Sequence, residues 1–142
     1  MLAAFLILSA STMPLDVEGV WYTEGGQSQV EIVREGDSVT GRIVWYDGWE
    51  NEIVLDTENP DEALRGRELL GLPILEGFNE GRNKWRKGKI YDPTEGKTYR
   101  SAVYRLDENT LAVEGCVSVI CITQEWARVP EEDIVRGSRE AE

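Results

Sequence analysis

The sequence contains no histidine. Without an imidazole the chain has no Ser-His-Asp triad, no Cys-His pair and no histidine metal ligand. It has only two cysteines, in a C-x4-C arrangement that differs from the C-x-x-C redox spacing and is too small a set for a zinc site. We therefore expect no metal and no cofactor.

Basic residues are also few. The chain has 15 Lys and Arg against 27 Asp and Glu, which gives a net charge of −12 and a pI near 4.5. Contacts to phosphates require a basic surface, so this charge argues against a nucleic-acid partner. The charge is uneven, however, because residues 82–105 hold eight basic and two acidic side chains.

The sequence lacks an apolar run of the roughly 20 residues that a transmembrane helix needs. Its first twelve residues, M-L-A-A-F-L-I-L-S-A-S-T, are apolar and end in small residues, as in a secretory signal peptide cleaved between Ala10 and Met13. We predict a signal peptide at residues 1–13 and a periplasmic or secreted protein that is not integral to the membrane. The alternative is a disordered or strand-forming N-terminus.

Alternation of apolar and polar residues predicts a single all-β domain at residues 14–129, followed by a loose polar tail at 130–142. The predicted strands are residues 18–23, 29–34, 39–46, 69–78, 85–91, 97–104, 110–116 and 122–129. Eight strands in up-and-down order leave two exposed edges unless the sheet closes. We therefore predict an eight-stranded antiparallel β-barrel, which is wide enough to hold one small ligand.

One short helix is predicted near residues 60–67, with Asn59 as its N-cap and Glu62 completing a capping box. Carboxylates are dense here, and calcium binding is the alternative role for Asp56 and its neighbours. The spacing does not match an EF-hand loop. The nearby pair Asp92 and Glu95 leaves acid–base catalysis as a third possibility, but turn formation already explains Asp92, and we expect no enzymatic activity.

Gly19 and Trp21 at the start of the first strand, with Arg128 near the end of the last, resemble the signature of the calycin superfamily, which includes the lipocalins. In that pattern the arginine lies across the tryptophan ring and the pair closes one end of the barrel. The resemblance implies a structural role for these three residues.

A second resemblance extends over nearly the whole chain after residue 18. It rests on Gly19-Val20-Trp21, Gly41-Arg42-Ile43-Val44-Trp45, Asn59-Pro60-Asp61 with Leu64-Arg65 and Arg67, Leu70-Gly71-Leu72 with Ile74-Leu75, Gly88-Lys89-Ile90-Tyr91-Asp92-Pro93 with Gly96-Lys97-Thr98-Tyr99, and Thr123-Gln124 with Trp126 and Arg128. These blocks are similar to a bacterial family called domain of unknown function 2147. The resemblance implies an exported, lipocalin-like barrel in the Gram-negative envelope. Residues 117–120, Val-Ser-Val-Ile, depart from the family pattern, since they are more β-branched than the glycine-rich connection expected there.

Cys116 and Cys121 are predicted to form a disulfide if the protein is exported. For so short a loop the cross-link contributes about 2 kcal/mol. The alternative is a pair of buried thiols.

Aromatic and basic residues are the candidate ligand-binding groups. They are Trp45, Arg65, Arg67, Trp85, Tyr91, Tyr99 and Arg100. An apolar cavity with a few polar groups would hold a small amphipathic or anionic molecule, and we predict this binding function. Core packing of the aromatics and solvation of the arginines remain open. The alternative function is an envelope interaction module with a packed barrel and a basic surface that contacts an acidic partner or lipid head groups. The oligomeric state is left open.

Overall fold

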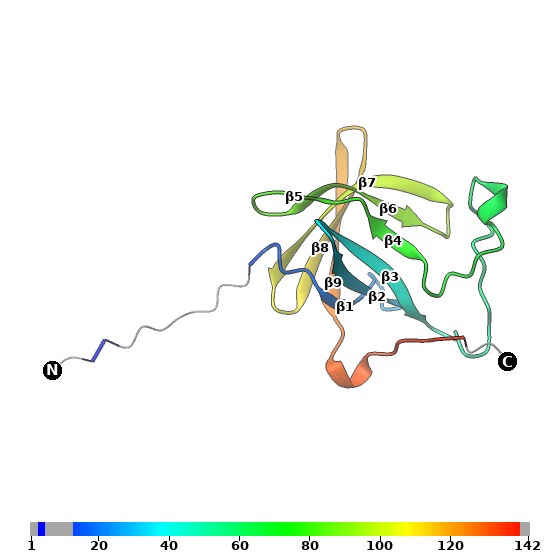
Figure 1. Ribbon diagram of the computed structural model, residues 1–142, viewed down its shortest axis with the longest axis horizontal. Coiled ribbons are helices and arrows are strands. Elements are labelled where there is room, and N and C mark those ends of the chain that lie inside the picture. Colours follow the sequence, from blue (N-terminus) through cyan, green and yellow to red (C-terminus); the bar gives the residue numbers. More distant parts are fainter. Residues whose placement is uncertain (1–2, 5–12, 140–142) are drawn as a thin grey trace.

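The computed structural model describes residues 3–4 and 13–139, so the predicted signal peptide lies largely outside the described residues. The described residues form nine strands: β1 (Gly19–Tyr22), β2 (Ser28–Glu35), β3 (Ser38–Tyr46), β4 (Pro73–Glu76), β5 (Asn79–Glu80), β6 (Trp85–Asp92), β7 (Lys97–Asp107), β8 (Thr110–Val117) and β9 (Ile120–Arg128). They form one antiparallel sheet in the order β4-β3-β2-β1-β9-β8-β7-β6-β5 (Figure 1).

An additional pairing of β4 with β6 closes the sheet into a barrel. Eight strands form the wall, and the two-residue β5 pairs only with the first residues of β6. The predicted eight-stranded antiparallel barrel is therefore confirmed. β4 is shorter than the apolar run that predicted it. Gly71 and Gly77 adopt left-handed φ values of 87° and 75° on either side of it, and proline occupies its first residue.

The predicted helix is wrong. The structure has a 3₁₀ turn at Glu62–Leu64, capped by Asp61, whose side chain accepts a hydrogen bond from the Ala63 N–H. Asn59 is not the cap, because the turn begins only after Asp61. The Asn59 side-chain amide donates to Asp56 at 2.8 Å, and its side-chain oxygen accepts from the Asp61 N–H. A second 3₁₀ turn lies at Glu131–Asp133.

One end of the barrel is closed by the segment that precedes β1. The indole N–H of Trp21 donates to the Val17 carbonyl at 3.0 Å, and that of Trp85 donates to the Leu15 carbonyl at 2.9 Å. Both tryptophans are almost fully buried. We call this end, which also holds the turn between β7 and β8, the closed end.

Two arginines cover Trp21 at the closed end. The guanidinium carbon of Arg128 lies 4.5 Å from the ring centroid, and that of Arg105 lies 5.8 Å from it. A Cβ at Gly19, where φ is 135°, would lie 3.0 Å from the Arg128 guanidinium. Glycine is therefore needed both for its backbone conformation and for the close approach of the arginine.

Residues 130–139 pack against the barrel, contrary to the loose tail that the sequence predicted. Buried Gln29 on β2 donates to the Asp133 carbonyl at 2.9 Å and accepts from the Val135 N–H at 3.0 Å. Arg136 binds both carboxylate oxygens of Glu31. Polar side chains on the outer face of β2 therefore hold the tail, a feature that the charged composition of the tail conceals.

The predicted disulfide is confirmed: Cys116 and Cys121 are joined, with Cα atoms 4.1 Å apart. They lie opposite each other on β8 and β9, one pair before the turn formed by Ser118 and Val119. Ser118 has a φ of 55°, a conformation usually taken by glycine. The β-branched connection thus forms a tight turn with a non-glycine residue in the left-handed region.

Candidate functional site

A cavity of about 650 Å³ opens at the end of the barrel opposite the closed end. We call this end the mouth; the turns that follow β1, β6 and β8 surround it. Ile43, Ile74, Ile90, Val113 and Trp126 form its apolar walls and floor. The eight-stranded barrel is therefore packed at one end and hollow at the other.

The rim of the cavity is polar and acidic. Glu24, Asp92 and Glu95 lie among its lining residues, and the described lining contains no Lys or Arg. Glu95 accepts a hydrogen bond from the Tyr99 hydroxyl at 2.9 Å, which, together with burial, raises the pKa of Tyr99. Asp92 accepts from both the N–H and the hydroxyl of Thr94. A molecule in the cavity would meet apolar side chains below and carboxylates at the mouth.

Tyr91 joins the rim to the long connection between β3 and β4. Its hydroxyl donates to the fully buried Asp56 at 2.5 Å, and Asn59 and Arg67 donate to the other carboxylate oxygen at 2.8 and 3.0 Å. Burial raises the pKa of Asp56, but these hydrogen bonds together with the positive charge of Arg67 outweigh it and hold the pKa below its usual value. Burial and the adjacent carboxylate raise the pKa of Tyr91 to about 12.

Both carboxylate oxygens of Asp56 accept hydrogen bonds from protein groups, so Asp56 has partners without a calcium ion. The described residues also bring Glu114, Cys116 and Cys121 close enough to surround a metal ion. The two sulfur atoms are joined in the disulfide, so neither is a thiolate that could bind a metal.

Of the aromatic residues proposed as ligand contacts, Tyr91 and Tyr99 line the cavity. Trp85 lies at the closed end, where its indole binds the Leu15 carbonyl. Trp45 lies beside Tyr22 in a second, shallow hollow of about 340 Å³. Alternation from Ile43 places Trp45 on the cavity face, but the pairing of β2 with β3 shifts register between these two residues. Such a bulge re-aims the side chains beyond it.

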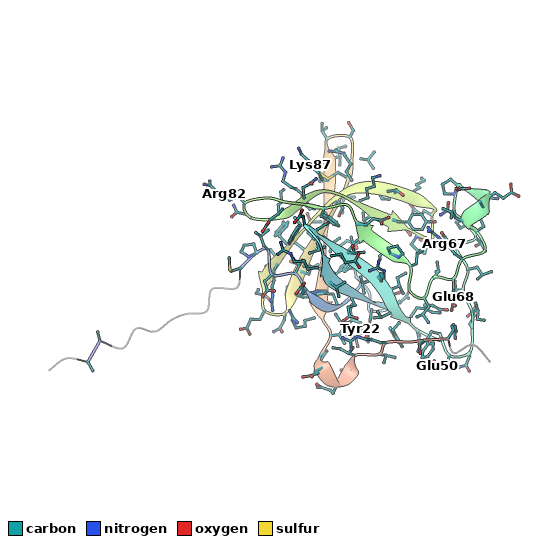
Figure 2. The ribbon with its side chains drawn as sticks, in the orientation of Figure 1. Tyr22, Glu50, Arg67, Glu68, Arg82 and Lys87 are labelled. Atoms are coloured by element: carbon teal, nitrogen blue, oxygen red, sulfur yellow. A yellow bond between two sulfur atoms is a disulfide. The ribbon has the colours of Figure 1, made fainter. Side chains whose placement is uncertain are left out.

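The three proposed arginines are not among the lining residues. Arg65 donates to the Asn59 carbonyl at 2.7 Å, Arg67 binds Asp56, and Arg100 bonds the Ser118 carbonyl from the outer face of β7. Figure 2 shows Arg67 on the side of the molecule that carries the long connection, with Arg82 on the opposite side of the view. The basic side chains are therefore dispersed over the outer surface and do not converge on the mouth.

Residues of β9 form much of the cavity wall, although the sequence analysis did not select them. They are Ile120, Ile122, Gln124 and Trp126. The sequence shows the two-residue period of this strand, because these residues alternate with Cys121, Thr123 and Glu125. What the alternation did not reveal was which of the two faces borders an empty space.

The model of a family described as an uncharacterized protein conserved in bacteria, DUF2147, matches residues 19–128. The chain belongs to this family. A Helicobacter pylori structure described as belonging to the lipocalin family is similar at a TM-score of 0.73, with 22% identity, 83% of this chain and 86% of that chain covered. That likeness concerns the fold. No curated protein matches the sequence significantly.

In the part of this DUF2147 protein that the structure describes, no helix is long and apolar enough to cross a membrane.

Proposed function

We propose that the barrel binds a small amphipathic molecule, with its apolar part in the cavity and its polar head at the mouth. The main evidence for this proposal is the cavity itself, whose volume of about 650 Å³ falls within the usual range for small-molecule sites. Isoleucine, valine and tryptophan side chains on its walls favour an apolar tail. The polar rim orients the head group toward solvent.

The head group is uncharged or cationic. An anion at the mouth would face Glu24, Asp92 and Glu95 without a cation among the described lining residues, in a chain of net charge −12. Like charges at such short range oppose binding, whereas an ammonium group would be attracted. This assignment departs from the anionic ligand that the basic segment 82–105 favoured, because those side chains point outward.

The site of action in this proposal is the periplasm or the extracellular space. A disulfide between Cys116 and Cys121 supports it, because disulfides persist in oxidising compartments and are rare in the cytosol. The alternative, an interaction module with a filled barrel, has less support because the mouth half of the barrel is not filled.

Native mass spectrometry of the protein purified gently from its own cell envelope tests the proposal. We expect an additional mass that dissociates on denaturation and belongs to an amphipathic molecule. A bare protein mass, together with tryptophan fluorescence that does not respond to uncharged or cationic amphiphiles, would contradict it.

A further inference from the structure

The strand β9 has a free edge over most of its length. β1 pairs with it only at Trp21 with Arg128 and Tyr22 with Ala127. From Ile120 to Trp126, β9 has β8 on one side and no described strand on the other. The barrel is therefore closed next to β1 only near the closed end, and it is open beside β9 at the mouth.

The backbone groups along this edge are available for pairing. Cys116 and Cys121 face each other with a Cα separation of 4.1 Å, the short spacing of a non-hydrogen-bonded antiparallel pair. The N–H and C=O groups of Cys121 therefore point away from β8, and alternation gives the same direction at Thr123 and Glu125. Within the described residues, no hydrogen bond outside the β8–β9 ladder reaches these groups.

The same hairpin exposes apolar side chains. Val117, Val119, Ile120 and Ile122 are 62%, 92%, 70% and 70% exposed. Figure 1 shows the β8–β9 hairpin projecting beyond the rest of the barrel. Residues 115–124 contain no charge, although 30% of the chain is charged. A long, uncharged and apolar edge of this kind is a pairing site for another strand unless it is blocked.

We propose that β9 pairs antiparallel with β9 of a second copy of this chain. The partner must offer a strand edge, apolar side chains on the matching face and little charge. A lipid bilayer fails the first requirement, because hydrocarbon leaves the backbone groups of the edge unsatisfied. Within the described part of the chain, β9 itself meets all three requirements. A single two-fold contact between two β9 strands would therefore pair the free edges of both copies.

Charge restricts the contact to this place. Two molecules of net charge −12 repel each other over most of their surfaces, and the uncharged hairpin is where that repulsion is weakest. Pairing about Thr123 places Cys121 opposite Glu125 and Ile122 opposite Gln124. No like charges then face each other across the interface. Both copies use the same strand, so no other surface of the protein is needed.

The contact would also complete the cavity wall. The lining includes residues on both sides of the gap, with Glu24 and Gln27 from the β1–β2 turn on one side and Ile120 and Ile122 from β9 on the other. A partner strand would cover the two isoleucines and close the side of the cavity. The inference does not require a ligand, so it stands or falls separately from the binding proposal.

Sedimentation velocity of the full chain over a range of concentrations tests the inference. We expect a concentration-dependent dimer that strengthens as NaCl is raised, because salt screens the repulsion between the acidic copies. Thr123→Pro removes an N–H that points away from β8, so it should give a monomer while the β8–β9 ladder is kept. Thr123→Val, which retains the N–H, should still dimerise.

A cross-link gives a second readout that does not depend on tolerance of proline. Thr123→Cys places a thiol at the two-fold axis and should form an intermolecular disulfide on mild oxidation. Thr98→Cys, on the exposed outer face of β7 at the same end of the barrel, should not. A wild-type monomer at all concentrations and salts, or equal cross-linking of both variants, would overturn the inference. A monomer that floats with anionic vesicles would assign the hairpin to a lipid surface instead.

Discussion

Trp21 is the residue on which the closed end depends. Its ring is fully buried, its indole binds the Val17 carbonyl and Arg128 lies over one face. Trp21→Ala should lower the free energy of unfolding by about 3–5 kcal/mol, the usual loss for a large buried aromatic side chain. Urea denaturation measures this loss. Because the cavity is at the other end, ligand affinity of the folded variant should not change; weaker binding with an unchanged melting temperature would contradict the structural role.

Tyr91 gives a pH-dependent test at the same scale. Its pKa in the folded protein is raised to about 12 from 10.0, so its stabilising contribution is complete below pH 10 and is lost as the pH rises through 12. Asp56 has a lowered pKa, so its contribution is lost instead as the pH falls through that pKa. Tyr91→Phe should cost about 1–3 kcal/mol at neutral pH by leaving a buried acceptor with one donor fewer.

Denaturation of wild type and Tyr91→Phe between pH 7 and 12 is the measurement. The difference between the two proteins should be constant up to about pH 10 and shrink above it. A difference that does not shrink would mean that the tyrosine hydroxyl does not titrate against Asp56.

At the scale of elements, the β8–β9 turn carries a removable strain. Ser118 has a φ of 55°, and Cβ makes this region unfavourable by roughly 1 kcal/mol. Ser118→Gly should therefore raise the stability by about that amount. Ser118→Ala keeps the Cβ and is the matched control. Thermal unfolding under oxidising conditions distinguishes them, and an equal response of both variants would show that the backbone conformation is not the cause.

Elements also show what the sequence could and could not predict. Alternation located the strands, because most of them bury one face. It failed at the bulge between Ile43 and Trp45, which arises from pairing with β2. The capping pattern failed separately at residues 60–67, where the structure has only a 3₁₀ turn. There the Asn59 amide donates to Asp56, three residues earlier, and the same buried carboxylate accepts from Tyr91 on β6. A cluster that includes a distant strand therefore overrides the local capping preference.

For the whole molecule, the barrel and its disulfide were predictable, whereas the open end was not. Tyr91 and Tyr99 were selected as aromatic residues of a basic hairpin, and both line the cavity. The arginines selected with them lie outside. Strand alternation places Arg100 on the outer face of β7, and Arg65 and Arg67 lie in the connection between β3 and β4, where they bind Asn59 and Asp56. Net charge along the sequence does not reveal the face on which a charge lies.

The central claim is that the cavity at the mouth binds the ligand. A substitution that fills the cavity tests this claim directly. Gly115 lines the cavity, and a Cβ built there would approach Ile90 and Tyr99 only at 3.8 and 4.0 Å. The Cβ of Gly115→Leu therefore fits at ordinary van der Waals distance, and the rest of the side chain would occupy the cavity. Thr98→Leu adds the same side chain to the exposed outer face of β7 and is the control.

The most direct measurement is the titration of each protein with dodecyltrimethylammonium below its micelle concentration, followed by tryptophan fluorescence, with dodecyl sulfate as the chain-matched anion. Wild type and Thr98→Leu should bind the cation, more tightly than the anion, and Gly115→Leu should bind it at least about tenfold more weakly, a loss of about 1.4 kcal/mol. Unchanged binding by a folded Gly115→Leu protein would contradict the assignment of the cavity as the ligand site.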